Sequence, residues 1–334
     1  MSKRPPSKPL AEDELIARHF APLATHPGAL GLRDDAAVFK PPTGYELVIT
    51  ADAIVAGTHF FPDDPPETIA RKALRVNLSD LAAKGAEPAG FVLALGLPYS
   101  RPQWLEAFAA ALGADADAYA CPLLGGDTVK TTGPLFVSIT AFGTLPRGTM
   151  VQRSGAKAGD VIMVSGTIGD AALGLHLQRG TAPAEWKPDR KASDYLVSRY
   201  WMPQPRTTLA AAVRAHASAA MDVSDGLAGD LAKLCRVSGV SAEVEVANFP
   251  LSAAGQSALR DAPALLQTIL GGGDDYEILC TVSPEKADAF RAAVASAKVA
   301  VTAIGRIVAG TAPPRFRDEN GKEVDVGQGS FSHF

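Results

Sequence analysis

The chain has 334 residues, 47% apolar and 20% charged, which is typical of a folded protein with room for two domains. Its 32 basic and 36 acidic side chains give a formal net charge of −4. This balance provides no excess of positive charge that would favour binding to nucleic acid or to an anionic membrane. The three cysteines have no C-x-x-C spacing, so neither a zinc ribbon nor a disulfide framework is indicated, and a reducing cytoplasm is expected.

The first half of the chain predicts alternating helices and strands. Residues 1–10 are basic and rich in proline, and they are expected to be a disordered leader because they lack the apolar run of a signal peptide. A helix is expected to begin near Ala11. The later elements are expected as a strand at 46–55, a helix at 66–88, a strand at 91–98, a helix at 103–120, a loop at 123–133 and a strand at 134–145.

The helix expected at 66–88 carries one narrow polar stripe between two apolar faces. The stripe consists of Asn77, Asp80 and Lys84, which are spaced three and four residues apart and therefore share one side of a helix. We interpret Asp80 as lying away from an ordinary solvent face. Lys84 and Lys130 are interpreted as solvated surface charges in preference to the alternative, a contact with phosphate.

A segment rich in glycine and basic residues, 146–160, is expected to separate two domains at 11–150 and 151–334. Alternating strands and helices in the second domain predict an α/β fold. Strands are expected at 161–166, 219–224, 242–247, 276–282 and 301–308, and helices at 170–177, 227–239 and 284–297.

Aspartate stands beside glycine in several predicted loops. These aspartates are Asp34, Asp35, Asp52, Asp127, Asp222, Asp225, Asp230, Asp274 and Asp275. Any single one is explained by a turn or by a helix cap, and Asp225 could be only a cap. Adjacent pairs such as Asp34 and Asp35, however, place like charges together at a Coulomb cost, so a positive ion is expected nearby.

The residue types around these loops favour magnesium over zinc. The histidines have no metal-ligand spacing, whereas the carboxylates are accompanied by hydroxyls such as Thr50 and Ser224, and hard oxygen donors suit Mg²⁺. So many carboxylates predict more than one ion and a polyphosphate such as ATP. The P-loop, the dinucleotide-binding glycine motif and the protein-kinase catalytic loop are all absent from the sequence.

A series of motifs resembles one known family along nearly the whole chain. In order, the motifs are "ELIARHF", "DDAAVF", "GTHF", "KALRVNLSDLAAKGAEP", "LLGGDT", "RSGAKAGD", "DVSDGL", "GGGDDYEI", "IGRI" and a terminal "HF". They resemble the thiamine-monophosphate kinases, in the superfamily of aminoimidazole ribonucleotide synthetase and selenophosphate synthetase. The resemblance implies an α+β N-terminal domain with a ferredoxin-like sheet that forms a homodimer, and an α/β C-terminal domain with a mixed sheet.

The resemblance also implies ATP- and magnesium-dependent phosphorylation of thiamine monophosphate to thiamine diphosphate. Carried over by position, it implies magnesium ligands at Asp34, Asp35, Thr50, Asp52, Asp80, Asp127, Asp222 and Asp225. It implies ATP contacts at Gly126, Asp127, Arg153 and Ser224, and substrate contacts at His59, Asp274 and Phe331. The sequence departs from the family pattern at Arg33, Ala51, Asp274 and Gln328.

The implied chemistry needs no catalytic side chain. The second pKa of a phosphate monoester is about 6, so the acceptor is mostly dianionic at neutral pH and requires no general base. Direct in-line transfer without a phosphoenzyme is therefore expected. Two alternatives stay open: a sister enzyme that activates a carbonyl oxygen or selenide, and a non-catalytic sensor of nucleotide or thiamine phosphate.

Overall fold

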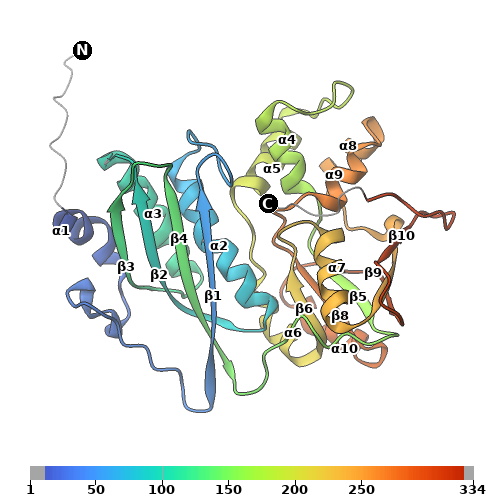
Figure 1. The fold of residues 1–334 in the computed structure, drawn as a ribbon, viewed down its shortest axis with the longest axis horizontal. Helices are drawn as coiled ribbons and strands as arrows, with labels where there is room; N and C mark the ends of the chain where they lie inside the picture. The colour runs from blue at the N-terminus through green and yellow to red at the C-terminus, as the bar shows by residue number, and fades with distance from the viewer. Residues whose placement is uncertain (1–11, 100, 327–334) are drawn as a thin grey trace. The chain divides into compact units, whose positions relative to one another are not determined.

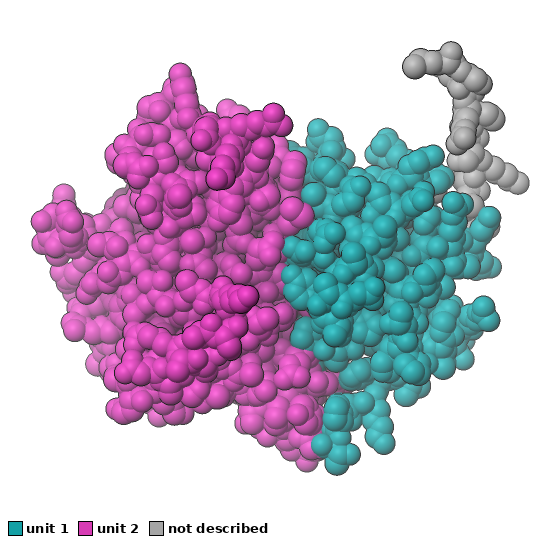
Figure 2. Space-filling view, turned by 180° about the vertical axis from the view of Figure 1, so that it is seen from behind, with its two compact units in different colours: residues 1–43, 49–77, 88–143 teal, residues 44–48, 78–87, 144–334 magenta. Residues whose placement is uncertain are grey.

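The computed structural model describes residues 12–99 and 101–326, in two compact units. One unit comprises residues 1–43, 49–77 and 88–143, and the other comprises 44–48, 78–87 and 144–334, as coloured in Figure 2. Two stretches of the first half therefore group with the second unit. The division into domains at 11–150 and 151–334 stays a prediction.

The first sheet has the strand order β1-β4-β2-β3. Its strands are β1 (Tyr45–Val55), β2 (Glu87–Leu97), β3 (Leu123–Lys130) and β4 (Phe136–Pro146). The prediction of a loop at 123–133 was wrong, because β3 pairs parallel to β2 with Gly126 opposite Leu93. A Cβ on Gly126 would stand 2.0 Å from the Leu93 carbonyl oxygen, so the glycine that suggested a loop is what permits this pairing.

Two long helices, α2 (Pro66–Ala83) and α3 (Pro102–Ala118), accompany the first sheet (Figure 1). They are joined by Asp115 of α3, which is 1% exposed. Its carboxylate accepts a hydrogen bond from Arg75 Nε at 2.6 Å and another from Arg71. Before β1, the helix expected near Ala11 is a short α1 (Glu12–Leu15), followed by a π-helical turn (Ile16–Phe20) and two 3₁₀ segments (Ala21–Leu23 and Pro27–Leu32).

The second sheet has the order β10-β7-β9-β5-β8-β6 and is mixed, since β10 runs parallel to β7 and the other described pairs are antiparallel. Its strands are β5 (Val161–Ser165), β6 (Ala217–Asp222), β7 (Ser241–Glu245), β8 (Ile278–Val282), β9 (Val301–Val308) and β10 (Arg315–Arg317). The helices are α4 (Asp170–Arg179), α5 (Arg190–Trp201), α6 (Ala210–His216), α7 (Leu227–Ser238), α8 (Ala253–Asp261), α9 (Leu265–Gly271) and α10 (Pro284–Ala295), with 3₁₀ turns at Thr207–Leu209 and Val246–Asn248.

Both faces of the second sheet are covered. On β5, Ile162 and Val164 belong to one hydrophobic cluster, while Met163 between them belongs to another. Alternate residues of a strand point to opposite faces, so each face of the sheet has its own core. This double burial explains the unbroken apolar run of β5. Within the described residues, no helix is both long and apolar enough to cross a membrane.

Candidate functional site

One pocket of the first unit collects four of the predicted site residues. It has a volume of about 270 Å³, and its wall includes Asp34, Asp35, Gly126 and Asp127. The Oδ1 atom of Asp34 accepts a hydrogen bond from the backbone N–H of Asp35 at 2.8 Å, which fixes the turn that presents both carboxylates. Among the described residues, no lysine, arginine or histidine lines this pocket, so this part of its acidic wall contains no cationic side chain.

Strand β1 places Thr50 and Asp52 on one face, because they alternate along the strand with the exposed Ile49. The backbone N–H of Asp52 donates to Oδ1 of the buried Asn77 at 3.1 Å. The Asn77 amide in turn donates to the Ala73 carbonyl at 3.0 Å within α2. Asn77, the first residue of the polar stripe of α2, therefore anchors the strand that carries Asp52.

His59 lies in the turn that follows β1. Its Nδ1 atom accepts a hydrogen bond from the backbone N–H of Val55 at 3.1 Å. The ammonium of Lys72 donates to the His59 carbonyl oxygen at 3.1 Å. These contacts fix the ring orientation and, because Nδ1 is an acceptor, place the proton of the neutral ring on Nε2.

In the second unit, two predicted acidic loops are joined through their backbones. Strand β6 pairs with β8 so that Asp222 stands opposite Ile278. Beyond that pair, the N–H of Asp274 donates to the Ser224 carbonyl at 2.9 Å. A Cβ on Gly273 would stand 2.2 Å from the same carbonyl oxygen, so only glycine allows this approach. The structure thus brings together Asp222, Ser224, Asp225 and Asp274.

The third aspartate of the "DVSDGLAGD" stretch is structural. Asp230 is fully buried, and one of its carboxylate oxygens accepts the N–H groups of Ser224 at 3.0 Å and Asp225 at 2.9 Å. Burial raises the pKa of Asp230. Asp225 does not cap the following helix, whose N-cap is Gly226, and its carboxylate is instead ion-paired with Lys233.

The end of α2 joins this group of loops. Ser79 Oγ donates to the Tyr276 carbonyl at 3.5 Å, and the Lys84 ammonium donates to the Ala220 carbonyl of β6 at 2.6 Å. The pKa of Lys84 is lowered to about 8, mainly by burial and also by the charge of Arg153, while Asp222 and Asp80 act in the opposite direction. Lys84 is therefore not the solvated charge that the sequence predicted, and its ammonium lies within electrostatic reach of Asp80, Arg153 and Asp222.

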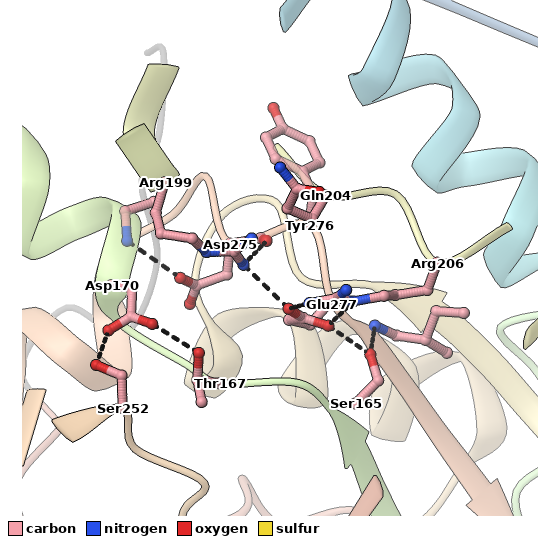
Figure 3. A network of polar contacts seen from close by, with 12 residues as sticks. Ser165, Thr167, Asp170, Arg199, Gln204, Arg206, Ser252, Asp275, Tyr276 and Glu277 are labelled. Atoms are coloured by element: carbon pink, nitrogen blue, oxygen red, sulfur yellow. Dashed lines mark hydrogen bonds and ion pairs between the residues drawn. The ribbon is translucent and has the colours of Figure 1, made fainter. Parts of the chain in front are cut away.

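A buried polar network supports the loop that carries Asp274 (Figure 3). Glu277, fully buried, accepts hydrogen bonds from Ser165 Oγ at 2.7 Å, Arg206 Nε at 2.6 Å and Arg199 at 3.0 Å. Asp275 is also fully buried and accepts the N–H of Gly169 at 2.7 Å. Sequence reasoning grouped Asp275 with the acidic loops, but its carboxylate supports the start of α4 instead of facing a ligand.

The buried carboxyl of Asp275 predicts a pH-dependent stability. Burial raises its pKa well above the ordinary value, so its stabilising contribution is fully present below the unfolded-state pKa of about 3.9 and is lost as pH rises through the folded-state pKa. In urea unfolding, the free energy of unfolding of Asp275→Asn relative to wild type should therefore rise with pH. Each unit of pKa shift is worth about 1.4 kcal/mol. Asp288→Asn, at a fully exposed side chain, should show no such trend.

The predicted site residues form two described sets, one in each unit. Within the described part of the chain, no three His, Cys, Asp or Glu side chains converge closely enough to hold a metal ion alone. Magnesium commonly takes only one or two carboxylates and completes its shell with water and substrate phosphates. Phe331 and Gln328 lie outside the described residues.

Comparison with known proteins defines the class of protein. Residues 33–145 match the AIR synthase related protein, N-terminal domain, and residues 157–313 match the corresponding C-terminal domain. A thiamine-monophosphate kinase of Caulobacter vibrioides is 47% identical over 311 residues, which is 92% of this chain and 86% of that protein. The chain belongs to the thiamine-monophosphate kinase family.

Solved structures show the same relationship. The crystal structure of a thiamine-monophosphate kinase from Stenotrophomonas maltophilia K279a is 38% identical, with a TM-score of 0.80 over 95% of this chain and 99% of that one. The structure of AaThiL complexed with AMPPCP and TMP is 30% identical, with a TM-score of 0.76 over 90% and 91% of the two chains.

Proposed function

We propose that this chain transfers the γ-phosphoryl group of ATP to thiamine monophosphate, in a magnesium-dependent reaction that yields thiamine diphosphate. The observation that carries the proposal is that the chain matches thiamine-monophosphate kinases nearly end to end. The neighbour complexed with AMPPCP and TMP supports both substrates.

The acceptor requires little help from protein acids or bases. A phosphate monoester is mostly dianionic at neutral pH, and its oxygen attacks without losing a proton. The barrier lies in bringing this dianion to a triphosphate, since two unit charges 4 Å apart repel by about 4 kcal/mol at an effective dielectric of 20. Arg153 lowers the pKa of Lys84. We assign Arg153 to binding of the nucleotide phosphates, because a guanidinium can donate two parallel hydrogen bonds to phosphate oxygens.

The oxygen donors fit magnesium. The described residues of the pocket in the first unit include three carboxylates and no cationic side chain, and carboxylate and hydroxyl oxygens are the ligands that this hard ion prefers. We propose that more than one ion is held by Asp34, Asp35, Thr50, Asp52, Asp80, Asp127, Asp222 and Asp225. When bound, magnesium would supply positive charge that offsets repulsion between the phosphates.

The remaining contacts are assigned by position within the family. The Gly126 and Ser224 positions would contact ATP phosphates together with Asp127, and His59, Asp274 and Phe331 would contact thiamine monophosphate. The backbone geometry supports the Asp274 assignment, since its φ of 70° is rare for a residue other than glycine and is maintained by the hydrogen bond to Ser224.

A panel of reactions tests the proposal. Purified protein with ATP and Mg²⁺ is given thiamine monophosphate, thiamine, or no acceptor, and the products are separated by chromatography. We expect thiamine diphosphate and ADP in equal amounts, and only in the reaction that contains thiamine monophosphate. ATP binding without any product would instead identify a sensor, and ATP consumption without thiamine diphosphate would favour a sister enzyme of the superfamily.

We also propose a homodimer formed through the first sheet, for which a ferredoxin-like arrangement is expected. On the edge strand β1, Tyr45, Leu47 and Ile49 alternate on one face and are 37%, 38% and 61% exposed. Apolar side chains in a row on a strand at the sheet edge favour burial against another chain. The three cysteines are buried free thiols, which suits the reducing cytoplasm that we predict as its location.

Introducing a charge on this strand should separate the dimer. In sedimentation velocity, wild type is expected at twice the chain mass of 34.7 kDa, and Ile49→Asp at the mass of one chain, because a carboxylate would be buried unpaired in the interface. Val237→Asp, at an exposed apolar position of α7, should remain dimeric. A monomeric wild type would contradict the dimer.

A further inference from the structure

Lys84 stands at the C-terminal end of α2. Its backbone N–H donates to the carbonyl of Asp80 at 3.0 Å, and the chain then turns at Gly85, whose φ is 75°. The last carbonyls of a helix carry partial negative charge, which favours a cationic side chain at this point. The ammonium does not extend into solvent, because it donates to the Ala220 carbonyl of β6.

The contacts of Lys84 reach three segments that each carry a proposed site residue. Its backbone N–H bonds to Asp80 itself. Its carbonyl oxygen accepts the N–H of Val151 at 3.2 Å, two residues before Arg153. Its ammonium is bonded to Ala220, two residues before Asp222. The backbone and side chain of one residue therefore connect the ends of α2 and β6 with the segment after β4.

The charge of Lys84 is as informative as its position. Asp80 and Asp222 attract the ammonium, whereas Arg153 repels it. Burying an ammonium carries a desolvation cost that an apolar side chain of similar length would not carry. A role in packing α2 against β6 therefore accounts for the length of this side chain, and its charge is stabilised by the end of the helix and by the two carboxylates.

We propose that Lys84 is a positioning residue of the phosphoryl-transfer site: a fixed cation that orients Asp80 and Asp222 and weakens their affinity for Mg²⁺. This inference deepens the proposed function and relies on it. Because the ammonium and the metal are both attracted to the same two carboxylates and repel each other, the lysine would let the ions leave with the products after each turnover.

Two substitutions separate charge from packing. Lys84→Met keeps the length of the side chain and removes its charge, and Lys84→Arg keeps the charge. In titration calorimetry of Mg²⁺ into nucleotide-free protein, Lys84→Met should bind the ion roughly tenfold more tightly, from the loss of one nearby positive charge. Lys84→Arg should bind it as wild type does, as should Lys286→Met, at an exposed lysine of α10.

The steady-state constants provide a second readout. Lys84→Met is expected to lose roughly tenfold in kcat, with the KM for thiamine monophosphate unchanged, because misplaced carboxylates affect the transition state more than substrate binding. Lys84→Arg should recover most of the lost kcat. If Lys84→Met does not fold, Lys84→Gln provides the same comparison with an uncharged side chain.

The results distinguish this inference from the proposed function. Equal Mg²⁺ affinity in wild type, Lys84→Met and Lys84→Arg would overturn the role of Lys84, even if wild type makes thiamine diphosphate. Tighter Mg²⁺ binding by Lys84→Met in a protein that makes no thiamine diphosphate would support Lys84 as part of a metal site and refute the kinase reaction.

Discussion

Replacing Asp222 with asparagine should lower kcat/KM for thiamine diphosphate formation by about 10³-fold, as expected for removal of one preorganised electrostatic group. Asp222 ends β6 and is 3% exposed, and the loop after it is held to the Asp274 loop by backbone hydrogen bonds. Asparagine has the same shape and no charge, so the fold should be kept while a proposed metal ligand is weakened.

The control for Asp222→Asn is Asp261→Asn, at an exposed residue that ends α8, and it should leave the rate unchanged. Equal far-ultraviolet circular dichroism of all three proteins would exclude unfolding as the cause of a loss. Because the proposed role is metal binding, part of the loss in Asp222→Asn should be recovered by raising Mg²⁺. A variant within twofold of wild type would remove Asp222 from the site.

Truncating Glu277 to alanine should lower the free energy of unfolding of the second unit by about 3–5 kcal/mol. The carboxylate is the shared partner of Arg199 and Arg206, whose side chains are 8% and 19% exposed. Removing it leaves two guanidinium groups largely buried without their counter-charge, and Ser165 loses an acceptor. Such uncompensated buried charge is among the most destabilising consequences of a single substitution.

Urea unfolding followed by the fluorescence of Trp186 and Trp201, which both lie in the second unit, measures this effect. The matched control is Glu243→Ala, which removes a more exposed ion pair with Arg306 and should lower the free energy of unfolding much less, because water screens the charges of an exposed pair. Equal shifts of the unfolding midpoint for the two variants would show that the network of Figure 3 contributes no more than a surface pair.

Elements with strong periodic signals could be predicted from the sequence. The strand expected at 301–308 has the bounds of β9, and the helix expected at 66–88 contains α2. Strand β3 was not predicted, because its Leu-Leu-Gly-Gly-Asp start has the composition of a loop. The neighbouring strand β2 explains why this segment is a strand: Gly126 lies opposite Leu93, where any side chain would collide with the backbone of Leu93.

Helices α5, α8 and α9 were not predicted either. Helix α8 is nine residues long and contains Gly255, which lowers its intrinsic propensity. It depends on the Ser252 side chain, which caps the N–H of Gly255 and donates to Asp170 at 2.5 Å. The contact with Asp170 spans 82 positions of the chain, and propensity and periodicity carry no information about it.

For the candidate site, the sequence identified where acidic loops occur but not which carboxylates face inward. Asp274 and Asp275 are adjacent, yet Asp275 is fully buried and Asp274 is not. Asp230 is likewise fully buried and Asp225 is not. The register of β6 and the start of α7 decide which way each carboxylate points. The role of Lys84 was missed because the contact that buries its ammonium spans 136 positions of the chain.

Transfer of a labelled phosphoryl group under single-turnover conditions tests the kinase reaction most directly. Protein in excess is mixed with Mg²⁺, thiamine monophosphate and ATP labelled in the γ-phosphoryl group, and the label is followed in ATP, protein, inorganic phosphate and thiamine diphosphate. We expect the label to enter thiamine diphosphate at the rate at which it leaves ATP, with none on the protein. Label that remains in ATP, is released as phosphate or first accumulates on the protein would contradict direct transfer to thiamine monophosphate.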